Sequence, residues 1–141
     1  MKILFDYNRT LFNPDTGDLY PGVFRVLKTL SARHALFLIT LDKPERKDSA
    51  AIADLRPYFT EVKFVERKSA AIFQELVGNT DQKVIVIGDR LEDEIRIGIK
   101  LGYITIHLPN GPFSAAAGKI RPAHRATSIT KVLEIIATYE Q

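Results

Sequence analysis

The chain has 141 residues, about the length of one ordinary domain, so we expect a single domain over residues 1–141. Hydrophobic residues make up 45% of it and charged residues 26%, a balance typical of a globular protein and not of a disordered one. The chain has no cysteine, which excludes disulfides, thiolate metal sites and cysteine nucleophiles.

The N-terminal residues give no indication of export. Asp6 interrupts the apolar segment before a run of signal-peptide length develops. No window of the chain reaches the ~18 apolar residues that a membrane-spanning helix needs. We therefore expect a cytoplasmic protein without a membrane partner.

The formal net charge of +3 is unevenly distributed, because no Asp or Glu occurs between Glu94 and Glu134. A basic stretch of this kind could attract an anionic substrate or nucleic acid. It contains no dense basic run and little aromatic interleaving, so a solvated surface is the stronger interpretation and a nucleic-acid partner the weaker one.

Short apolar runs alternate along the chain with helix-length amphipathic segments. This pattern predicts an α/β fold: a three-layer, Rossmann-like parallel sheet with helices on both faces. The five expected strands are Lys2–Phe5, Ala35–Thr40, Val62–Val65, Lys83–Ile87 and Tyr103–His107. The expected helices are Gly22–Arg33, Pro44–Asp54, Lys68–Val77, Leu91–Leu101 and Ser128–Tyr139.

Several of these helices carry start or stop signals. Asp42 and Ser128 are candidate N-caps, and Gly78 and Gly102 are candidate helix ends. One segment interrupts the alternation, because Leu11–Tyr20 contains a run of turn-forming residues between two apolar pairs. We expect it to form a small hairpin directly after the first strand.

Two aspartates follow directly after predicted hydrophobic strands. Asp6 ends Ile3-Leu4-Phe5, and Asp89 follows Val84 to Gly88. In open parallel sheets, ligands bind beyond the carboxyl ends of the strands, so the two carboxylates meet in one cleft if their strands are neighbours. Hard oxygen ligands of this kind favour Mg²⁺, which keeps several waters and completes its shell with a substrate phosphate.

The three histidines do not indicate a softer metal, because His34, His107 and His124 are scattered along the chain and are expected to be structural.

Four features then occur in a fixed order along the chain. They are Asp-Tyr-Asn-Arg-Thr at positions 6–10, Thr40 at the end of a strand, Lys68 at a helix start, and Gly88-Asp89 with Asp93 after the fourth strand. This set resembles the motifs of the haloacid dehalogenase-like (HAD) hydrolases, across nearly the full length of the chain. The resemblance implies a HAD-like fold in which the hairpin is the flap after strand one, with no separate cap domain.

The resemblance also implies catalytic roles for Asp6, Asn8, Thr40 and Lys68. Asp6 matches the nucleophile that attacks phosphorus to form an aspartyl-phosphate, which water then hydrolyses. Thr40 matches the residue that hydrogen-bonds a phosphoryl oxygen, and Lys68 matches the cation that offsets the charge there. Lys63 and Arg67 lie near Lys68 in the chain, so the identity of this cation stays open.

The same resemblance implies the ligand contacts. Asp6, Asn8 through its backbone carbonyl, Asp89 and Asp93 are expected to hold the magnesium. The residues expected to bind substrate are Thr10, Arg9 and Thr40.

The first motif departs from the family pattern at Asn8. The family phosphatases have there a second aspartate that acts as general acid and base, a role that an amide cannot perform. We therefore expect a Mg²⁺-dependent phosphatase with weakened acid–base catalysis. The alternative is a catalytically impaired HAD-fold protein that binds phosphate and metal or acts as a regulator.

The expected partner is a phosphorylated small molecule or macromolecule. Members of the family without a cap domain often act on macromolecules or form oligomers in which a neighbour shields the site, so a homo-oligomer is a further expectation.

Overall fold

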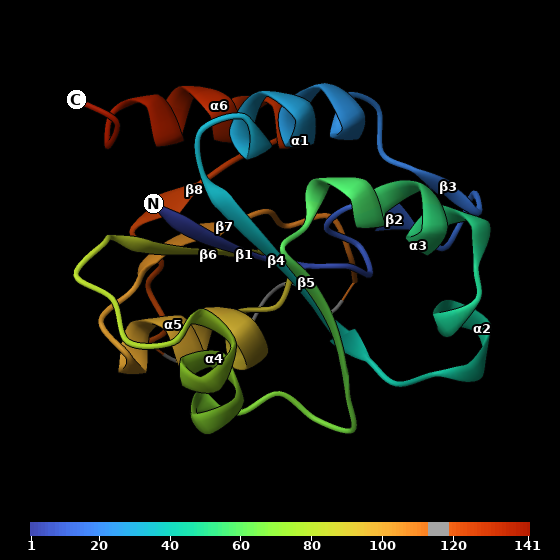
Figure 1. The fold of residues 1–141 in the computed structure, drawn as a ribbon, viewed down its shortest axis with the longest axis horizontal. Coiled ribbons are helices and arrows are strands. Elements are labelled where there is room, and N and C mark those ends of the chain that lie inside the picture. The colour runs from blue at the N-terminus through green and yellow to red at the C-terminus, as the bar shows by residue number, and fades with distance from the viewer. Residues whose placement is uncertain (113–118) are drawn as a thin grey trace.

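The computed structural model describes residues 1–112 and 119–141, which form a parallel sheet covered by helices on both faces (Figure 1). The sheet has six strands in the order β5-β4-β1-β6-β7-β8, with β1 and β6 at its centre. Their bounds in chain order are β1 Lys2–Asp6, β4 Ala35–Leu41, β5 Glu61–Val65, β6 Val84–Gly88, β7 Ile104–His107 and β8 His124–Arg125.

The expectation of five strands was therefore wrong by one. The additional strand, β8, has only two residues and pairs in parallel with the end of β7, with Ile106 opposite His124. Neither of its residues is apolar, so the sequence carries no hydrophobic run that marks a buried strand. Its extended conformation comes from pairing with the sheet edge.

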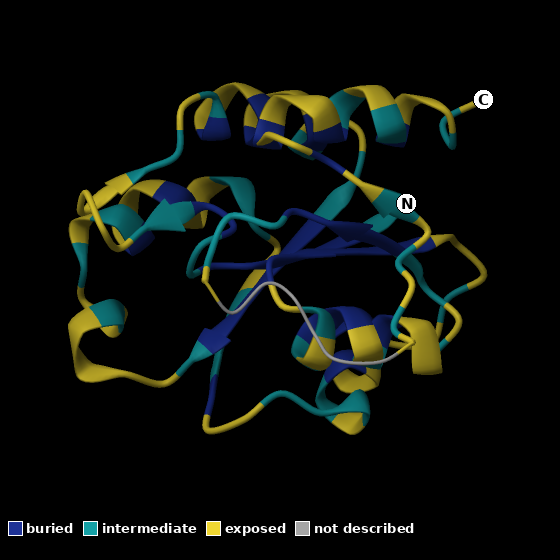
Figure 2. Ribbon diagram, turned by 180° about the vertical axis from the view of Figure 1, so that it is seen from behind, coloured by how far each residue is buried: buried dark blue, intermediate teal, exposed yellow. Residues whose placement is uncertain are grey.

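Two hydrophobic clusters lie between the sheet and the helices. Figure 2 shows the central strands of the sheet as buried, in dark blue. Successive residues of a strand point to opposite faces, and β1 shows this directly: Ile3 and Phe5 join one cluster, and Leu4 joins the other. The first cluster includes residues of α1 (Val23–Ser31), α3 (Ala50–Leu55) and α6 (Ile129–Ala137). The second includes residues of α4 (Ala70–Val77), with α5 (Arg96–Lys100) packed against it.

The expected helix Pro44–Asp54 is in fact two helices, α2 (Pro44–Lys47) and α3, followed by the 3₁₀ turn η1 (Arg56–Tyr58). Ser49 adopts an extended conformation between α2 and α3, and its hydroxyl accepts a hydrogen bond from the Ile52 backbone N–H. A serine bonded in this way starts a new helix. Asp42 does not cap α2, whose N-cap residue is Lys43 without a side-chain bond.

The other helix signals were partly right. Gly78 ends α4, and Gly102, at φ +75°, follows the end of α5. Ser128 is the N-cap residue of α6, but its side chain makes no capping hydrogen bond. The expected helix Leu91–Leu101 begins as a π-helical turn, η2 (Leu91–Ile95), before continuing as α5.

The segment after β1 forms the expected short hairpin. Its strands, β2 (Phe12–Asn13) and β3 (Asp18–Leu19), pair antiparallel. Gly17 occupies the left-handed region at φ +78° in the turn between them, a conformation that glycine adopts at little cost. Within residues 1–112 and 119–141, no helix is sufficiently long and apolar to cross a membrane.

Candidate active site

A cavity of about 560 Å³ lies where the central strands end. β1 and β6 are hydrogen-bonded neighbours with Phe5 opposite Ile87, so Asp6 and Asp89 leave adjacent strands at nearly the same level. Both aspartates line this cavity, as the strand-end argument predicted. The lining residues are Asp6, Tyr7, Asn8, Arg9, Phe12, Pro14, Leu41, Lys43, Glu45, Arg46, Ser49, Lys68, Asp89, Arg90 and Asp93.

Asp6 is a buried carboxylate, only 5% exposed, at the floor of the cavity. Its Oδ1 accepts a hydrogen bond of 2.5 Å from Lys68 Nζ, and its Oδ2 accepts one of 3.2 Å from the Thr10 hydroxyl. Burial, reinforced by the nearby Glu94 carboxylate, raises the pKa of Asp6 to about 6, although Lys68 acts in the opposite direction. The Asp6 carboxylate is therefore ionised at neutral pH, and its pKa lies close to neutrality.

Lys68 is the cation that contacts the candidate nucleophile. Besides its bond to Asp6, its Nζ lies 3.1 Å from a Glu94 oxygen and 3.7 Å from an Asp93 oxygen. Burial disfavours the ammonium, but the three carboxylates outweigh this effect and the pKa of Lys68 is raised. Neither Lys63, within β5, nor Arg67 lines the cavity.

Glu94 belongs to the site but was not singled out from the sequence. It is 1% exposed; Oε2 accepts from Lys68, and Oε1 accepts from the Arg90 backbone N–H at 3.0 Å. A Cβ atom on Gly88 would lie 2.2 Å from the Glu94 Cγ, so this close approach requires glycine. The sequence does contain one indication of this contact, which is a glycine, Gly88, between an apolar strand and an acidic helix start. The spacing of the family motif points to Asp93 and not to Glu94.

Asp89 is held by the loop that follows β7. Its Oδ1 accepts hydrogen bonds of 2.8 Å from the backbone N–H groups of Asn110 and Gly111. Its own carbonyl accepts a bond of 2.8 Å from His107 Nε2, a structural use of that histidine. Burial raises the pKa of Asp89; the two backbone bonds lower it, and the Asp6 carboxylate raises it further.

The three residues expected to bind substrate lie in different surroundings. Thr10 contacts Asp6, as described above. Thr40 is fully buried, does not line the cavity, and accepts a hydrogen bond of 3.0 Å from Arg46 Nη1. Arg9, at φ +60°, does line the cavity, but its guanidinium forms two hydrogen bonds with Asp15 in the hairpin. Arg46 was not singled out from the sequence.

The four residues expected to bind the metal all line the cavity, but their side chains do not converge on one point. Asn8, Asp89 and Asp93 line the cavity with Asp6, but Asp93 faces Lys68. Among the described residues, no group of three or more His, Cys, Asp or Glu side chains is arranged to hold a metal ion. What the site offers is two aspartates on adjacent strands, a set of hard oxygen donors that suits a magnesium ion retaining much of its water.

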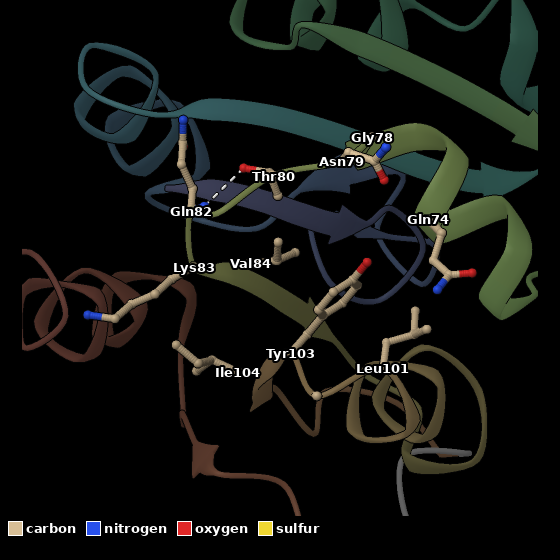
Figure 3. Close-up of a pocket in the computed structure, with 11 residues that line it drawn as sticks. Gln74, Gly78, Asn79, Thr80, Gln82, Lys83, Val84, Leu101, Tyr103 and Ile104 are labelled. Atoms are coloured by element: carbon tan, nitrogen blue, oxygen red, sulfur yellow. Dashed lines mark hydrogen bonds between the residues drawn. The ribbon is translucent and has the colours of Figure 1, made fainter.

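A slightly larger cavity, of about 610 Å³, lies at the opposite end of the sheet, where β6 and β7 begin (Figure 3). Its lining includes amide side chains, among them Gln74 and Gln82, together with Tyr103 and Lys83. No carboxylate lines it. The chemistry-bearing residues therefore gather at the carboxyl ends of the strands, not at this larger cavity.

The chain has the fold of the HAD-like hydrolases, as several solved structures show. A protein from Burkholderia xenovorans, described as a haloacid dehalogenase-like hydrolase, superposes with a TM-score of 0.85 at 13% identity, covering 99% of this chain and 98% of that one. The D,D-heptose 1,7-bisphosphate phosphatase of Burkholderia thailandensis gives a TM-score of 0.71 at 16% identity, with 96% and 98% covered.

A third similar structure is a HAD-type hydrolase from Bacillus subtilis in a magnesium-bound form. It superposes with a TM-score of 0.70 at 17% identity over 84% of this chain. The chain spans only 56% of the Bacillus protein. No protein-family model and no curated protein sequence matches the chain. At these identities the likeness establishes the fold.

Proposed function

We propose that the chain is a HAD-type phosphatase that cleaves a phosphate ester through a covalent intermediate on Asp6. The observation that carries this proposal is the environment of Asp6: a buried, ionised carboxylate on the cavity floor, held by Lys68 at one oxygen and by Thr10 at the other. Such a carboxylate is fixed in orientation and little solvated, as a nucleophile in phosphoryl transfer should be.

In the proposed reaction, an Asp6 oxygen attacks phosphorus while the bond from phosphorus to the leaving oxygen breaks. The leaving alkoxide or phenoxide takes a proton from solvent, because no carboxyl group stands at position 8. Water then attacks the aspartyl-phosphate, releases inorganic phosphate and regenerates Asp6. Lys68 remains bonded to Oδ1 and keeps the carboxylate aimed at the cavity.

Magnesium is the proposed cofactor. Asp6, Asp89 and the backbone carbonyl of Asn8 would hold it, with water and a phosphate oxygen completing the shell. The fit rests on the geometry, because Asp6 and Asp89 are buried carboxylates that leave adjacent strands and line the same cavity. The Asp6 carboxylate also raises the pKa of Asp89, and a cation between the two would offset this negative charge. When bound, the ion would neutralise charge on the phosphoryl group.

A second candidate function is favoured by Asn8, which lines the cavity where a phosphatase needs a general acid. An amide can neither protonate a leaving alcohol nor activate water, and such catalysis is worth ~10²–10⁴ in rate. A protein with this site would bind phosphate and metal with slow turnover or none, and would act as a binding or regulatory protein.

The proposed substrate is a phosphorylated small molecule or macromolecule. Phe12 and Pro14 of the hairpin line the cavity, and we propose that this hairpin is the flap that covers the reacting group. The part of the chain that the structure describes contains no separate cap domain, so we propose that a second copy of the chain shields the rest of the site.

The test is magnesium-dependent hydrolysis of p-nitrophenyl phosphate, whose activated leaving group needs little protonation. We expect activity in the wild type, none above background in Asp6→Asn, and wild-type rates in Asp81→Asn, an exposed aspartate that does not line the cavity. Activity at full strength in Asp6→Asn would exclude the mechanism.

Asn8→Asp separates the two candidate functions. On an alkyl phosphate, which needs a proton donor, we expect this variant to be faster than wild type by up to ~10²–10⁴. Wild-type protein that binds phosphate but hydrolyses no ester would favour the binding function.

A further inference from the structure

Arg46, on the short helix α2, reaches from the connection after β4 into the wall of the cavity. Two contacts fix its position. Its guanidinium lies over the Tyr7 ring, 5.9 Å from the ring centroid, and its Nη1 donates to the Thr40 hydroxyl at 3.0 Å. Tyr7 and Thr40 are themselves buried, so the half-buried arginine rests on a rigid base.

Two other cations that line the cavity, Lys68 and Arg9, are paired with carboxylates, whereas Arg46 has no such partner among the described residues. Lys68 lies among the carboxylates of Asp6, Asp93 and Glu94, and Arg9 is engaged by Asp15. By contrast, no carboxylate in the described part of the chain lies within salt-bridge distance of Arg46. A half-buried guanidinium without an anionic partner, at the edge of a cavity, has the charge and the donors to receive an anionic ligand.

Thr40 cannot itself meet a ligand in the cavity as the site stands. Its side chain is fully buried and is not part of the lining, whereas Arg46, which touches it, is. The hydroxyl that the family resemblance associates with phosphate binding is therefore covered by the arginine.

We propose that Arg46 binds the phosphoryl oxygens of the ligand, and that Thr40 and Tyr7 are the residues that position it. This inference rests on the proposed function in placing the phosphoryl group in the same cavity. A guanidinium presents paired, coplanar N–H donors that match two oxygens of a phosphate. Because Lys68 is occupied by carboxylates, Arg46 supplies positive charge that a phosphoryl dianion needs in this cavity.

The experiment measures the binding of inorganic phosphate by calorimetry to wild type, Arg46→Gln, Arg46→Lys and Arg56→Gln. We expect the dissociation constant of Arg46→Gln to rise at least about tenfold, since hydrogen bonds to charged groups contribute on this scale. Arg46→Lys keeps the charge without the planar fork, so its loss should be smaller. Arg56→Gln is the matched control: that arginine also lies over an aromatic ring, Phe64, but does not line the cavity.

Arg46→Gln that binds phosphate as tightly as wild type overturns the inference, and so does wild type that binds no phosphate. Circular dichroism and the thermal midpoint show whether each variant folds. If Arg46→Gln does not, a dissociation constant for Arg46→Lys equal to that of wild type overturns the inference.

Hydrolysis of the aryl phosphate by wild type and Asp6→Asn is measured in parallel and reports on the proposed function alone. Turnover that requires Asp6, with phosphate binding indifferent to Arg46, removes only the present inference. Phosphate binding that requires Arg46, without turnover of any ester, removes only the phosphatase.

Discussion

The most consequential contacts in this protein are those around the Lys68 ammonium. Its side chain is 4% exposed, and a buried ammonium is tolerated only where carboxylates surround it. Asp6 and Glu94 supply the two closest oxygens, and Glu94 also bonds the Arg90 backbone. Lys68 thus holds the Asp6 carboxylate and also ties it to the buried Glu94.

Replacing Glu94 by Gln should lower the free energy of unfolding by about 1–3 kcal/mol, because a buried ammonium loses one of its charged partners. Urea denaturation measures the change. The matched control is Glu92→Gln, whose salt bridge with Arg96 is 3.5 Å long and exposed to solvent. That substitution should stay within about 0.5 kcal/mol. Equal effects of the two changes would contradict the structural role of Glu94.

At the scale of elements, the ends of β1 and β6 place Asp6 and Asp89, and the start of α4 places Lys68. Lys68 directly precedes Ser69, whose hydroxyl accepts a hydrogen bond of 3.2 Å from the Ile72 backbone N–H at the start of α4. This cap fixes the residue at which α4 begins, and it therefore fixes the backbone position of Lys68. Ser128 occupies the corresponding position of α6 without making the bond.

Ser69→Ala should therefore lower the free energy of unfolding by about 1 kcal/mol, the usual value of a serine cap. Ser128→Ala should change it by only a few tenths of that amount, because no capping bond is lost. Thermal or urea unfolding of the two variants against wild type gives the comparison. A larger loss in Ser128→Ala than in Ser69→Ala would contradict the assignment of the caps.

At the scale of the whole molecule, the sheet order places the site at the end of a central strand that is buried from Ile3 to Asp6. β1 lies between β4 and β6 and carries Asp6 at its end, where the carboxylate is desolvated by burial. The desolvation that raises the pKa of Asp6 is also a cost to folding once the carboxylate is ionised. Stability and reactivity are therefore in opposition at this position.

This opposition predicts a pH dependence. Between the ordinary pKa of 3.8 and about 6, Asp6 holds its proton in the folded state but loses it in the unfolded state. The folded state then binds more protons, so stability falls as pH rises through this window. The free energy of unfolding of wild type minus that of Asp6→Asn should decrease from about pH 4 to about pH 7, measured in urea with a chelator present. A flat or rising difference would contradict the raised pKa.

Much of this architecture was predictable from local patterns. β1, β4 and β6 consist largely of apolar runs, and a strand buried on both faces needs no more than such a run to be recognised. Asp6 and Asp89 each follow such a run, which predicts one shared cavity if their strands are neighbours; the pairing of β1 with β6 meets that condition. The hairpin after β1 followed from its turn-forming residues.

Other features depended on contacts between distant parts of the chain. β8 is a strand because the edge of β7 is available to it, and Arg46 faces the cavity because Tyr7 and Thr40 hold it there. The break between α2 and α3 has a local cause, because Ser49 caps a new helix where the hydrophobic periodicity alone predicts a continuous one.

The sequence by itself determined the layer order, the sheet and the aspartates at its rim, because hydrophobic periodicity and strand direction are local properties. Only the tertiary structure decided which ionisable groups share the buried space: Glu94 joins Asp6 and Asp93 around Lys68. The physical reason is that ion pairing depends on distances of a few ångströms between side chains far apart in the chain, which no spacing along the sequence specifies.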